Sequence, residues 1–581
     1  MSRAADSLSS ASASALATHA RALLSDPSSL RAYAVPAAQL AGTLAALFIG
    51  WFMYQVLFRA RYFSRLRHLP GPEYGHWLLG QTRQVVQREP GMAFLEWKGT
   101  YGEKGVIRVV TAFGRERIVF YTRSAVKQIL VDRPYDYPKP SYLRLILGQV
   151  AGEGLLTFEG SEHSSLRKFL SRAFAPRYLQ EQYESSYHGP ISNLIKTWQK
   201  QISETPKPSE GLEIEVFAWV SRCLLDIIGL AAFGYEINSI ADDKNDLGSA
   251  YHAVTKLQNG VNLVGLIGIM VTPGGAQLLQ WAGQRAWTGK AILAVHGLAA
   301  SLGLGSLFIA VKNLGILLQS TYTIESVAAK LMDQKMDEAR KLGPGAMDSG
   351  KMDILSLLVK ASLTDQSSYK MSRKDVKNTI LTVLAAGHET TASGVTWTLW
   401  MLAKHPEVQE KLRKEVKALT SAYEHPPFAD LKELKYLGAV ISESLRVFPP
   451  TPATSRQAAV DSVIDGVFIP KGTVILIPSR AMNLDPVGDW GADAGDFKPE
   501  RWLDLPPTYD ATFSLMTFIA GAHKCIAYQM AQNEMRLITA MLVANFHFEL
   551  ISPDQTVVAE SAITMKPYAG LPLRVRRVDA A

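Results

Sequence analysis

Cysteine is scarce in this chain, which has only Cys223 and Cys525 among its 581 residues. Two cysteines form at most one disulfide, so the protein does not depend on a disulfide framework and a reducing compartment is expected. Zinc-ligand spacings and long basic runs are also missing, although the formal net charge is +8. Nucleic acid is therefore not expected as a partner, and the charge is better matched by an anionic membrane or an acidic protein.

Strand-like runs are few and short, and no internal repeat is visible. Helix-period segments dominate between residues 160 and 450, and hydrophobic residues make up 47% of the chain against 20% charged ones. These values fit a globular protein with extra apolar surface. We predict a mainly α fold with small β-sheets, in one large unit over residues 73–581. The expected helices are 164–174, 217–233, 375–403, 406–419 and 528–546, and the expected strands are 105–111, 117–121, 466–469 and 473–478.

The amino terminus contains a long apolar run. Residues 1–34 are rich in Ala and Ser and are expected to form a flexible tail. Residues 35–58 carry no charge, and as a helix they would be roughly 36 Å long, enough to cross a bilayer. A cleaved signal peptide or a buried core helix are the alternatives, but the run is long and starts late for a signal peptide. We predict one transmembrane anchor.

A basic segment follows the anchor at residues 59–72. It contains Arg59, Arg61, Arg65 and Arg67, a denser cluster than the arginines before the anchor. Because positive residues favour the cytoplasmic side, the body is expected in the cytosol. The segment ends in Pro-Gly-Pro, which cannot continue a helix and predicts a stiff hinge.

A second apolar region lies at residues 259–320, which are rich in glycine. Its stretch 292–311 is nearly long enough to cross a membrane, so a second span is one alternative. That span would separate Arg167 and Cys525, which the assignments below bring together. A segment that dips into one leaflet is therefore the preferred interpretation.

The strongest chemical signal lies near the carboxyl end, at Cys525. This cysteine precedes a predicted helix, where the helix dipole and free backbone amides stabilise a thiolate. Gly521 allows a tight turn and the close approach of a flat cofactor, and Phe518 can pack beside the sulfur. A lone cysteine is usually a small buried hydrophobe, but this setting favours a thiolate ligand of heme iron, which promotes O–O cleavage.

The predicted helix 375–403 carries a second motif, in which Thr390 lies four residues after Ala386. The threonine hydroxyl can draw the Ala386 carbonyl away from the helix ladder, and Gly387 leaves the widened groove without a side chain. A kink of this kind would make room for dioxygen and water. An ordinary helix with a threonine and a glycine is the alternative.

Two further pairs of charged or basic residues are spaced so that each pair would share one face of a helix. Glu443 and Arg446 lie three residues apart and share a helix face, where they can pair. An ordinary surface ion pair is the alternative and would be worth little. His163 and Arg167 lie four apart and could hold an anionic propionate, unless they simply form a solvated face.

These motifs together resemble the cytochrome P-450 family, whose heme-binding loop reads Phe-x-x-Gly-x-Arg-x-Cys-x-Gly. The resemblance runs from about residue 70 to 575 and does not cover an apolar insertion at about 280–318. His523 stands where the family has Arg, which keeps a donor for a heme propionate. Ala527 replaces the last Gly, a small-for-small change that slightly crowds the loop.

The resemblance implies that heme b is the cofactor, with Cys525 as the axial ligand of its iron. It also implies a propionate-binding role for Arg456. The residues expected to bind the cofactor are Cys525, Phe518, Gly521, His523, His163, Arg167, Arg456, Ala386 and Gly387.

The resemblance also gives roles to residues that do not contact the iron. Arg501 would join Glu443 and Arg446 in a buried structural triad that supports the heme loop. Thr390 and its acidic neighbour Glu389 would deliver protons to dioxygen, the co-substrate. These two residues are the expected catalytic residues.

The implied fold is the family's, and the implied reaction inserts one oxygen atom into a lipophilic small molecule and reduces the other to water. Electrons would come from a separate NADPH-dependent flavoprotein reductase, docking near Lys168 and Lys524. The expected location is the endoplasmic reticulum membrane, with a single pass and a cytosolic catalytic domain. A heme-thiolate isomerase or dehydratase, or a non-catalytic heme-binding membrane adaptor, remain alternatives. Fatty acids, terpenoids, polyketides and sterols all remain open as substrates.

Overall fold

The computed structural model describes residues 27–242, 245–257, 265–266, 268–270, 272, 274–342, 353–363, 371–561 and 563–578. Most of the expected flexible tail, and residues 259–264, 267, 271 and 273 of the apolar region, lie outside this description. The chain divides into two units: residues 1–68, 73–82 and 110–116 form the smaller, and the remainder forms the larger.

The smaller unit is built around α2 (Pro27–Met53), which continues into η1 (Tyr54–Phe63). The helix therefore begins before residue 35 and takes in the last residues of the expected tail. Large apolar side chains of α2, such as Leu47 and Trp51, are more than half exposed. Ala60 is fully buried instead, and Gly114 of η2 (Ala112–Gly114) packs so closely on η1 that a Cβ there would meet the Gln55 carbonyl at 2.4 Å. Within this unit α2 thus has an apolar surface that no described residue covers.

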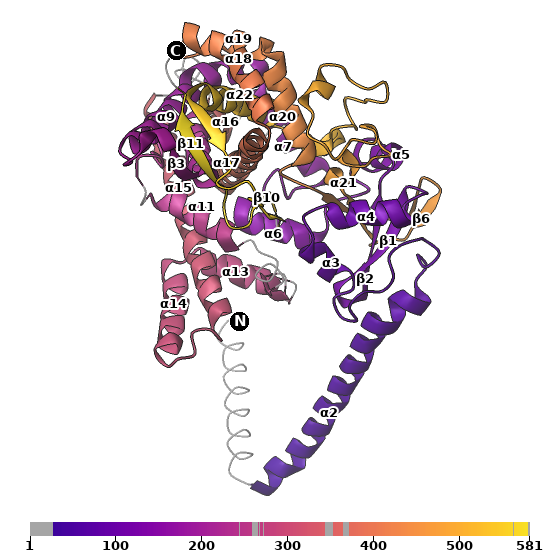
Figure 1. The fold of residues 1–581 in the computed structure, drawn as a ribbon. Helices are drawn as coiled ribbons and strands as arrows, with labels where there is room; N and C mark the ends of the chain where they lie inside the picture. Colours follow the sequence, from indigo (N-terminus) through magenta and orange to yellow (C-terminus); the bar gives the residue numbers. More distant parts are fainter. Residues whose placement is uncertain are drawn as a thin grey trace. The chain divides into compact units, whose positions relative to one another are not determined.

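The larger unit is mainly helical, as the sequence predicts (Figure 1). Its helices up to the middle of the chain are α3 (Thr82–Gln87), α4 (Met92–Tyr101), α5 (Arg123–Lys127), η3 (Gln128–Asp132), α6 (Ser141–Ala151), α7 (Gly160–Leu170), η4 (Ser171–Phe174), α8 (Pro176–Gln182), η5 (Tyr183–Tyr187), α9 (His188–Ser203), η6 (Pro208–Glu210), α10 (Val216–Phe233), α11 (Asp246–Leu257), α13 (Gly275–Gly283) and α14 (Ala286–Ser301). The remaining helices are α15 (Ile309–Leu342), α16 (Ile354–Leu363), α17 (Arg373–Lys404), α18 (Pro406–Ala422), α19 (Phe428–Glu433), α20 (Lys435–Val447), α21 (Ser479–Asn483), η8 (Pro499–Trp502), η9 (Met516–Phe518), η10 (Gly521–His523) and α22 (Tyr528–Asn545).

The sheets are small. One has the order β1-β2-β7-β4, with β2 and β7 parallel and β4 antiparallel to β7. A three-stranded sheet has the order β3-β11-β8, and β5–β6 and β9–β10 are two-stranded antiparallel pairs. The strands are β1 (Val106–Thr111), β2 (Arg115–Phe120), β3 (Leu212–Glu215), β4 (Thr454–Gln457), β5 (Ser462–Ile464), β6 (Val467–Ile469), β7 (Val474–Ile477), β8 (Phe546–Glu549), β9 (Ala559–Ser561), β10 (Met565–Pro567) and β11 (Pro572–Arg577).

The long helix α17 runs through the core and packs against α10, α15, α20 and α22. It begins at a capping box, in which the Ser372 side chain accepts from the Asp375 amide and the Asp375 carboxylate accepts from the Ser372 amide. That arrangement satisfies two amides that the first turn of a helix leaves unpaired. Buried apolar residues then continue for most of the length of α17. The helix that carries Ala386 and Thr390 is therefore fixed by packing on several sides.

The apolar region 292–311 is broken into two helices, not one. Helix α14 ends at Ser301 and α15 begins at Ile309, and the two lie side by side (Figure 1). Glycines allow this close approach, because a Cβ on Gly289 would lie 2.7 Å from the Gln319 amide nitrogen and one on Gly315 would lie 2.8 Å from the Leu293 side chain. A single membrane span over 292–311 is therefore wrong, and the region forms a helical hairpin.

Candidate functional site

Cys525 lies in the loop between η10 and α22, and the backbone of this loop is tightly constrained. The Cys525 amide donates to the Phe518 carbonyl at 3.0 Å. Gly521 has φ +71°, and a Cβ there would meet the Leu130 carbonyl oxygen at 1.8 Å. The close approach that this glycine permits is therefore to the backbone of η3, whereas the sequence suggested a flat cofactor. Ile519, with φ +55°, holds a backbone conformation that is costly for a β-branched residue.

The electrostatic surroundings of Cys525 are basic. Burial raises the pKa of its thiol, while the Ala527 amide and the charges of Arg167 and Lys524 oppose that rise. Burial also lowers the pKa of Arg167, and the Cys525 charge counteracts this effect. The charges of Arg167 on α7 and of the Cys525 sulfur therefore stabilise each other. The Phe518 ring meets the Tyr528 ring edge-on, with 6.2 Å between their centroids.

His523 and His163 lie together, although the chain separates them widely. Their rings are stacked with centroids 4.2 Å apart. His523 Nε2 lies 3.1 Å from Glu159 Oε2. The other carboxylate oxygen, Glu159 Oε1, accepts a hydrogen bond from Lys139 Nζ at 3.2 Å. Although burial acts in the opposite direction, the hydrogen bond from His523 and the charge of Lys139 bring the pKa of Glu159 down to about 2. Sequence analysis missed Lys139 and Glu159, because no spacing connects them to His523.

Arg456 on β4 is the most deeply buried cation in this cluster. It is 1% exposed, and its Nη1 donates to Thr454 Oγ1 and to the Ser455 carbonyl, both at 2.8 Å. Its Nε and the Nδ1 of His523 are buried, and neither has a hydrogen-bond partner among the described residues. Burial lowers the pKa of Arg456 to about 10 and that of Lys139 to about 8.

The buried Nε of Arg456, a donor without a partner among the described residues, lies with several cations around one carboxylate, and such a set fits an anionic group. The propionates of the heme that the sequence resemblance implies have this chemistry, and the sulfur of Cys525 is the group that would bind its iron as a thiolate. The residues present therefore fit the group: Cys525 would hold its iron, and the residues that would hold its propionates are Lys139, His163, Arg167, Arg456 and His523.

The groove motif on α17 has the predicted hydrogen bond but not the predicted break. Thr390 Oγ1 donates to the Ala386 carbonyl at 2.8 Å, while α17 remains α-helical from Arg373 to Lys404. Gly387 also has a different role from the one expected. A Cβ on Gly387 would lie 2.9 Å from Ile228 Cδ1, so its missing side chain makes room for α10 and not for the groove. At Gly387, α17 therefore packs closely on α10.

Glu389 is held by the C-terminal part of the chain. It is 8% exposed, and its Oε1 accepts from the Thr564 hydroxyl at 2.7 Å. The neighbouring strand β10 is fixed on α17, because the Met565 carbonyl accepts from Ser393 Oγ at 2.5 Å and from Trp397 Nε1 at 3.1 Å. Sequence analysis missed Thr564, which lies far from any recognised motif. This hydrogen bond orients the carboxylate beside the Thr390 turn.

The three residues of the expected triad meet in the core. Arg446 makes two hydrogen bonds of 2.8 Å to the Glu443 carboxylate, and Arg501 Nε donates to the same carboxylate at 2.9 Å. Glu443 and Arg446 are 0% exposed, so this is not a surface ion pair. Trp502 Nε1 donates a further bond to Glu443 at 2.9 Å, which sequence analysis missed.

The triad is connected to the cysteine loop through the backbone. Arg446 also donates to the carbonyls of Asn483, Ala494 and Asp496 at 2.6–2.9 Å, which fixes the segment ahead of the loop. Thr517 donates from η9 to the Leu445 carbonyl of α20 at 2.8 Å. Breaking a buried ion pair typically costs about 3–5 kcal/mol. The triad therefore stabilises the position of the loop.

Comparison with known proteins agrees with this geometry. The family model described as Cytochrome P450 matches residues 70–268 and 300–571. Cytochrome P450 monooxygenase sphH of Aspergillus fumigatus is 28% identical, over 92% of this chain and 92% of its own length. Cytochrome P450 monooxygenase 205 of Postia placenta is 30% identical, over 87% of this chain and 90% of its own length. Cytochrome P450 monooxygenase FUM15 of Gibberella moniliformis is 28% identical, over 91% of this chain and 91% of its own length. The residues that the family model skips are those of α13 and most of α14.

Proposed function

The chain belongs to the cytochrome P450 family and is a monooxygenase, and from that premise we propose that it hydroxylates or epoxidises a lipophilic small molecule. The observation that carries this proposal is the buried cationic cradle beside Cys525. When bound, heme supplies the redox chemistry that divides dioxygen between the substrate and water. The protein's own residues then have to hold that group, exclude bulk water and move protons.

The residues divide these tasks between them. Cys525 would hold the heme iron as a thiolate, and Arg456, whose Nε has no partner among the described residues, would neutralise a propionate together with Arg167. Thr390, whose hydroxyl is held on the Ala386 carbonyl, relays protons within the groove. Glu389, oriented by Thr564, is the acid that supplies them.

Electrons are supplied by a separate NADPH-dependent flavoprotein reductase. Lys168 on α7 and Lys524 beside the ligand are both exposed, so they give the cysteine side of the protein a positive surface. An acidic reductase would be attracted to that surface.

The test is reconstitution of the heme-loaded protein with a microsomal reductase and a panel of terpenoids, sterols, polyketides and fatty acids. We expect NADPH consumption that depends on dioxygen, with an oxygenated product from at least one compound. Isotopically labelled dioxygen should leave one labelled atom in that product. A product that forms without dioxygen or NADPH would indicate the isomerase or dehydratase, and heme binding without any turnover would favour the adaptor.

We also propose that the protein is attached to the endoplasmic reticulum membrane, with its catalytic unit in the cytosol. Ala38–Phe63 is long and apolar enough to span a bilayer, and the arginines at its carboxyl end favour a cytosolic body. The other described helix that meets this criterion, Val216–Phe233, is largely buried in the core.

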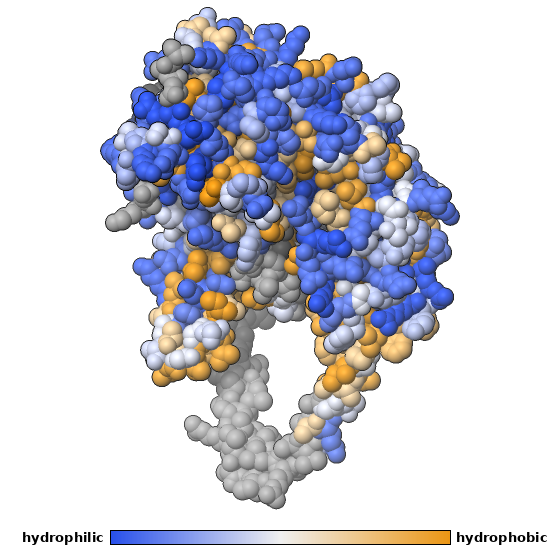
Figure 2. Space-filling model, viewed as in Figure 1, coloured by the Kyte–Doolittle hydropathy of each residue, from blue (hydrophilic) through white to orange (hydrophobic). Residues whose placement is uncertain are grey.

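The α14–α15 hairpin supports a second attachment. No Lys, Arg, Asp or Glu occurs over residues 291–311. Leu298, Leu302 and Leu307, around its tip, are 66–77% exposed. Figure 2 shows apolar side chains gathered over this end of the hairpin. Such a surface is suited to dipping into one leaflet.

Deletion of residues 1–53 is expected to abolish carbonate-resistant membrane association, because it removes α2. Detergent-sensitive association should remain through the hairpin and should disappear when Leu302→Glu and Leu307→Glu are added. The measurement is flotation with liposomes, and Leu503→Glu with Leu505→Glu, at exposed leucines elsewhere, is the control. Full solubility after the deletion alone would contradict the role of the hairpin.

A further inference from the structure

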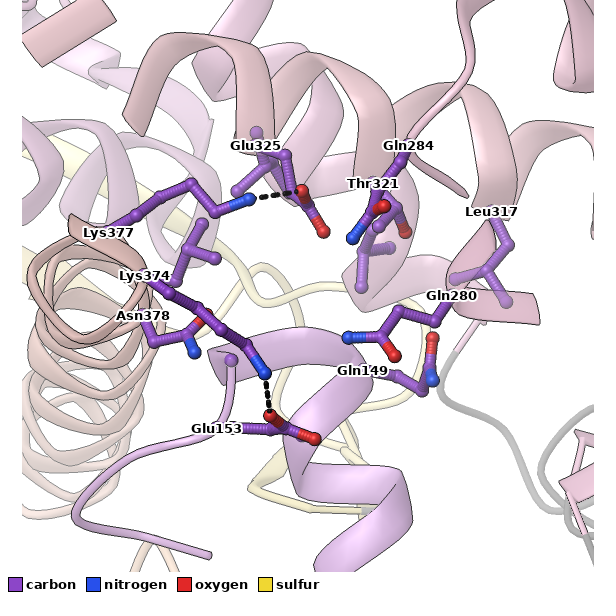
Figure 3. Close-up of a pocket in the computed structure, with 15 residues that line it drawn as sticks. Gln149, Glu153, Gln280, Gln284, Leu317, Thr321, Glu325, Lys374, Lys377 and Asn378 are labelled. Atoms are coloured by element: carbon purple, nitrogen blue, oxygen red, sulfur yellow. Dashed lines mark hydrogen bonds and ion pairs between the residues drawn. The ribbon is translucent and has the colours of Figure 1, made fainter. Parts of the chain in front are cut away.

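A cavity with both polar and apolar lining residues lies between α6, α13, α15 and α17, on the amino-terminal half of the helix that carries Thr390 (Figure 3). Its volume is about 160 Å³, room for about ten water molecules or a group of similar size. Of the α17 residues that line the cavity, Asn378 and Leu381 are the nearest in sequence to Ala386 and Thr390. Asn378 precedes Ala386 by eight residues, which corresponds to about 12 Å along the helix axis.

The cavity holds no uncompensated charge among its lining residues. Lys374 pairs with Glu153 at 2.7 Å and Lys377 with Glu325 at 2.9 Å, and Figure 3 shows both pairs on its walls. The first pair is about half exposed and lies at the mouth, whereas the side chains of the second are only 20–25% exposed. Because both lysines are neutralised, a carboxylate or phosphate would find no free cation here.

Neutral hydrogen-bonding side chains line the rest of the cavity. Asn378 is 7% exposed, and its amide has no hydrogen-bond partner among the described residues. Gln280 and Gln284, which are exposed, and Thr321, which is half-buried, face the same space from the opposite side (Figure 3). Each amide both donates and accepts, so the lining complements a group that does the same.

Aliphatic side chains complete the lining. Val254, Ile324 and Leu381 are at most 4% exposed and lie at its inner side, while Leu317 is partly buried. The ligand that fits is therefore polar on one side and apolar on the other. A neutral group with several hydroxyls or an amide, attached to a hydrocarbon chain, has this character.

We propose that this cavity binds the neutral, hydroxyl- or amide-bearing end of an elongated lipophilic ligand whose hydrocarbon part extends along α17 toward the Thr390 groove. The inference rests on the proposed function and deepens it, because it selects neutral oxygenated amphiphiles over free fatty acids as substrates. Asn378 is the central recognition residue, and the Lys377–Glu325 pair sets the preference for a neutral group.

The experiment compares glycerol monolaurate with laurate, two probes with the same acyl chain but a neutral or an anionic end. Binding to the heme-loaded protein is measured by calorimetry and by the heme absorption change. We expect the glycerol ester to bind at least about ten-fold more tightly, which corresponds to one or two hydrogen bonds. Asn378→Leu should remove that difference in affinity, because it should weaken the binding of the glycerol ester and leave the binding of laurate unchanged.

A charge change provides the opposite test. Glu325→Gln leaves Lys377 without its partner, so laurate should gain about ten-fold in affinity while the ester changes little. Glu338→Gln is the matched control, since Glu338 pairs with Lys335 on the same helix outside the cavity. Equal affinities of both probes in the wild type, or no effect of both Asn378→Leu and Glu325→Gln, would overturn the proposal. Binding without oxygenation of any compound would contradict the proposed function and not this site.

Discussion

Replacement of Cys525 by serine is expected to abolish the absorption band of the reduced, carbon monoxide-bound protein that gives the family its name. A serine hydroxyl at this position cannot supply the thiolate that the band requires. The fold should survive, because the loop is held by the Gly521 turn and the Glu443 triad and not by the sulfur. The measurement is the difference spectrum after reduction, together with oxygenation of any substrate found, which should fall below detection.

The control is Cys223→Ala, at the other cysteine of the chain. Cys223 is fully buried in the core on α10, and burial raises the pKa of its thiol well above the usual value. Such a cysteine acts as a small hydrophobic residue, so its loss should leave the band unchanged. A Cys525→Ser protein that keeps the band would show that another residue holds the iron.

Local patterns in the sequence were enough to predict most of the secondary structure near the site. The expected helix 375–403 is α17, Arg373–Lys404, and the expected strand 473–478 is β7, Val474–Ile477. These elements were predictable because their hydrophobic periodicity and their end signals lie within the segments themselves. The capping box at Ser372 is a signal of this kind.

Contacts between distant segments could not be predicted in this way. Glu159 lies 364 positions from His523, and Thr564 lies 175 positions from Glu389, so no local spacing relates either pair. Both contacts depend on tertiary packing. The role of Gly387 also depends on tertiary packing: Thr390 does bond to the Ala386 carbonyl, but α17 continues as a helix there and Gly387 packs against α10.

The position where the sequence departs from the family pattern also gains an explanation from the fold. His523 is shorter than the arginine that usually stands there, and Glu159 and His163 fill the space around its ring. Lys139 adds a cation to the same cluster. Neighbours on other elements thus add positive charge and hydrogen-bonding groups around the smaller side chain.

Thr390→Ala is expected to uncouple NADPH consumption from product formation. The Thr390 hydroxyl, held toward the Ala386 carbonyl at 2.8 Å, is placed to pass a proton from the Glu389 side of the helix into the groove. A positioned acid–base group typically contributes about 10²–10⁴-fold, so product formation should fall steeply. Dioxygen that is reduced without this proton supply should leave as hydrogen peroxide. The measurement is the ratio of product and of peroxide to NADPH consumed.

The matched control is Thr398→Ala, two turns further along α17. Its hydroxyl makes the same type of bond, to the Gly394 carbonyl at 2.8 Å, but it is fully buried and away from the groove. This change should lower stability and leave the product-to-NADPH ratio intact, which separates proton relay from a general loss of helix packing. Heme content and ligand affinity should stay the same in Thr390→Ala, since Thr390 holds neither. An unchanged product-to-NADPH ratio in Thr390→Ala would mean that protons reach the groove by another route. The variant Thr564→Val, which removes the hydrogen bond to the Glu389 carboxylate, would then show by the same ratio whether Glu389 supplies them.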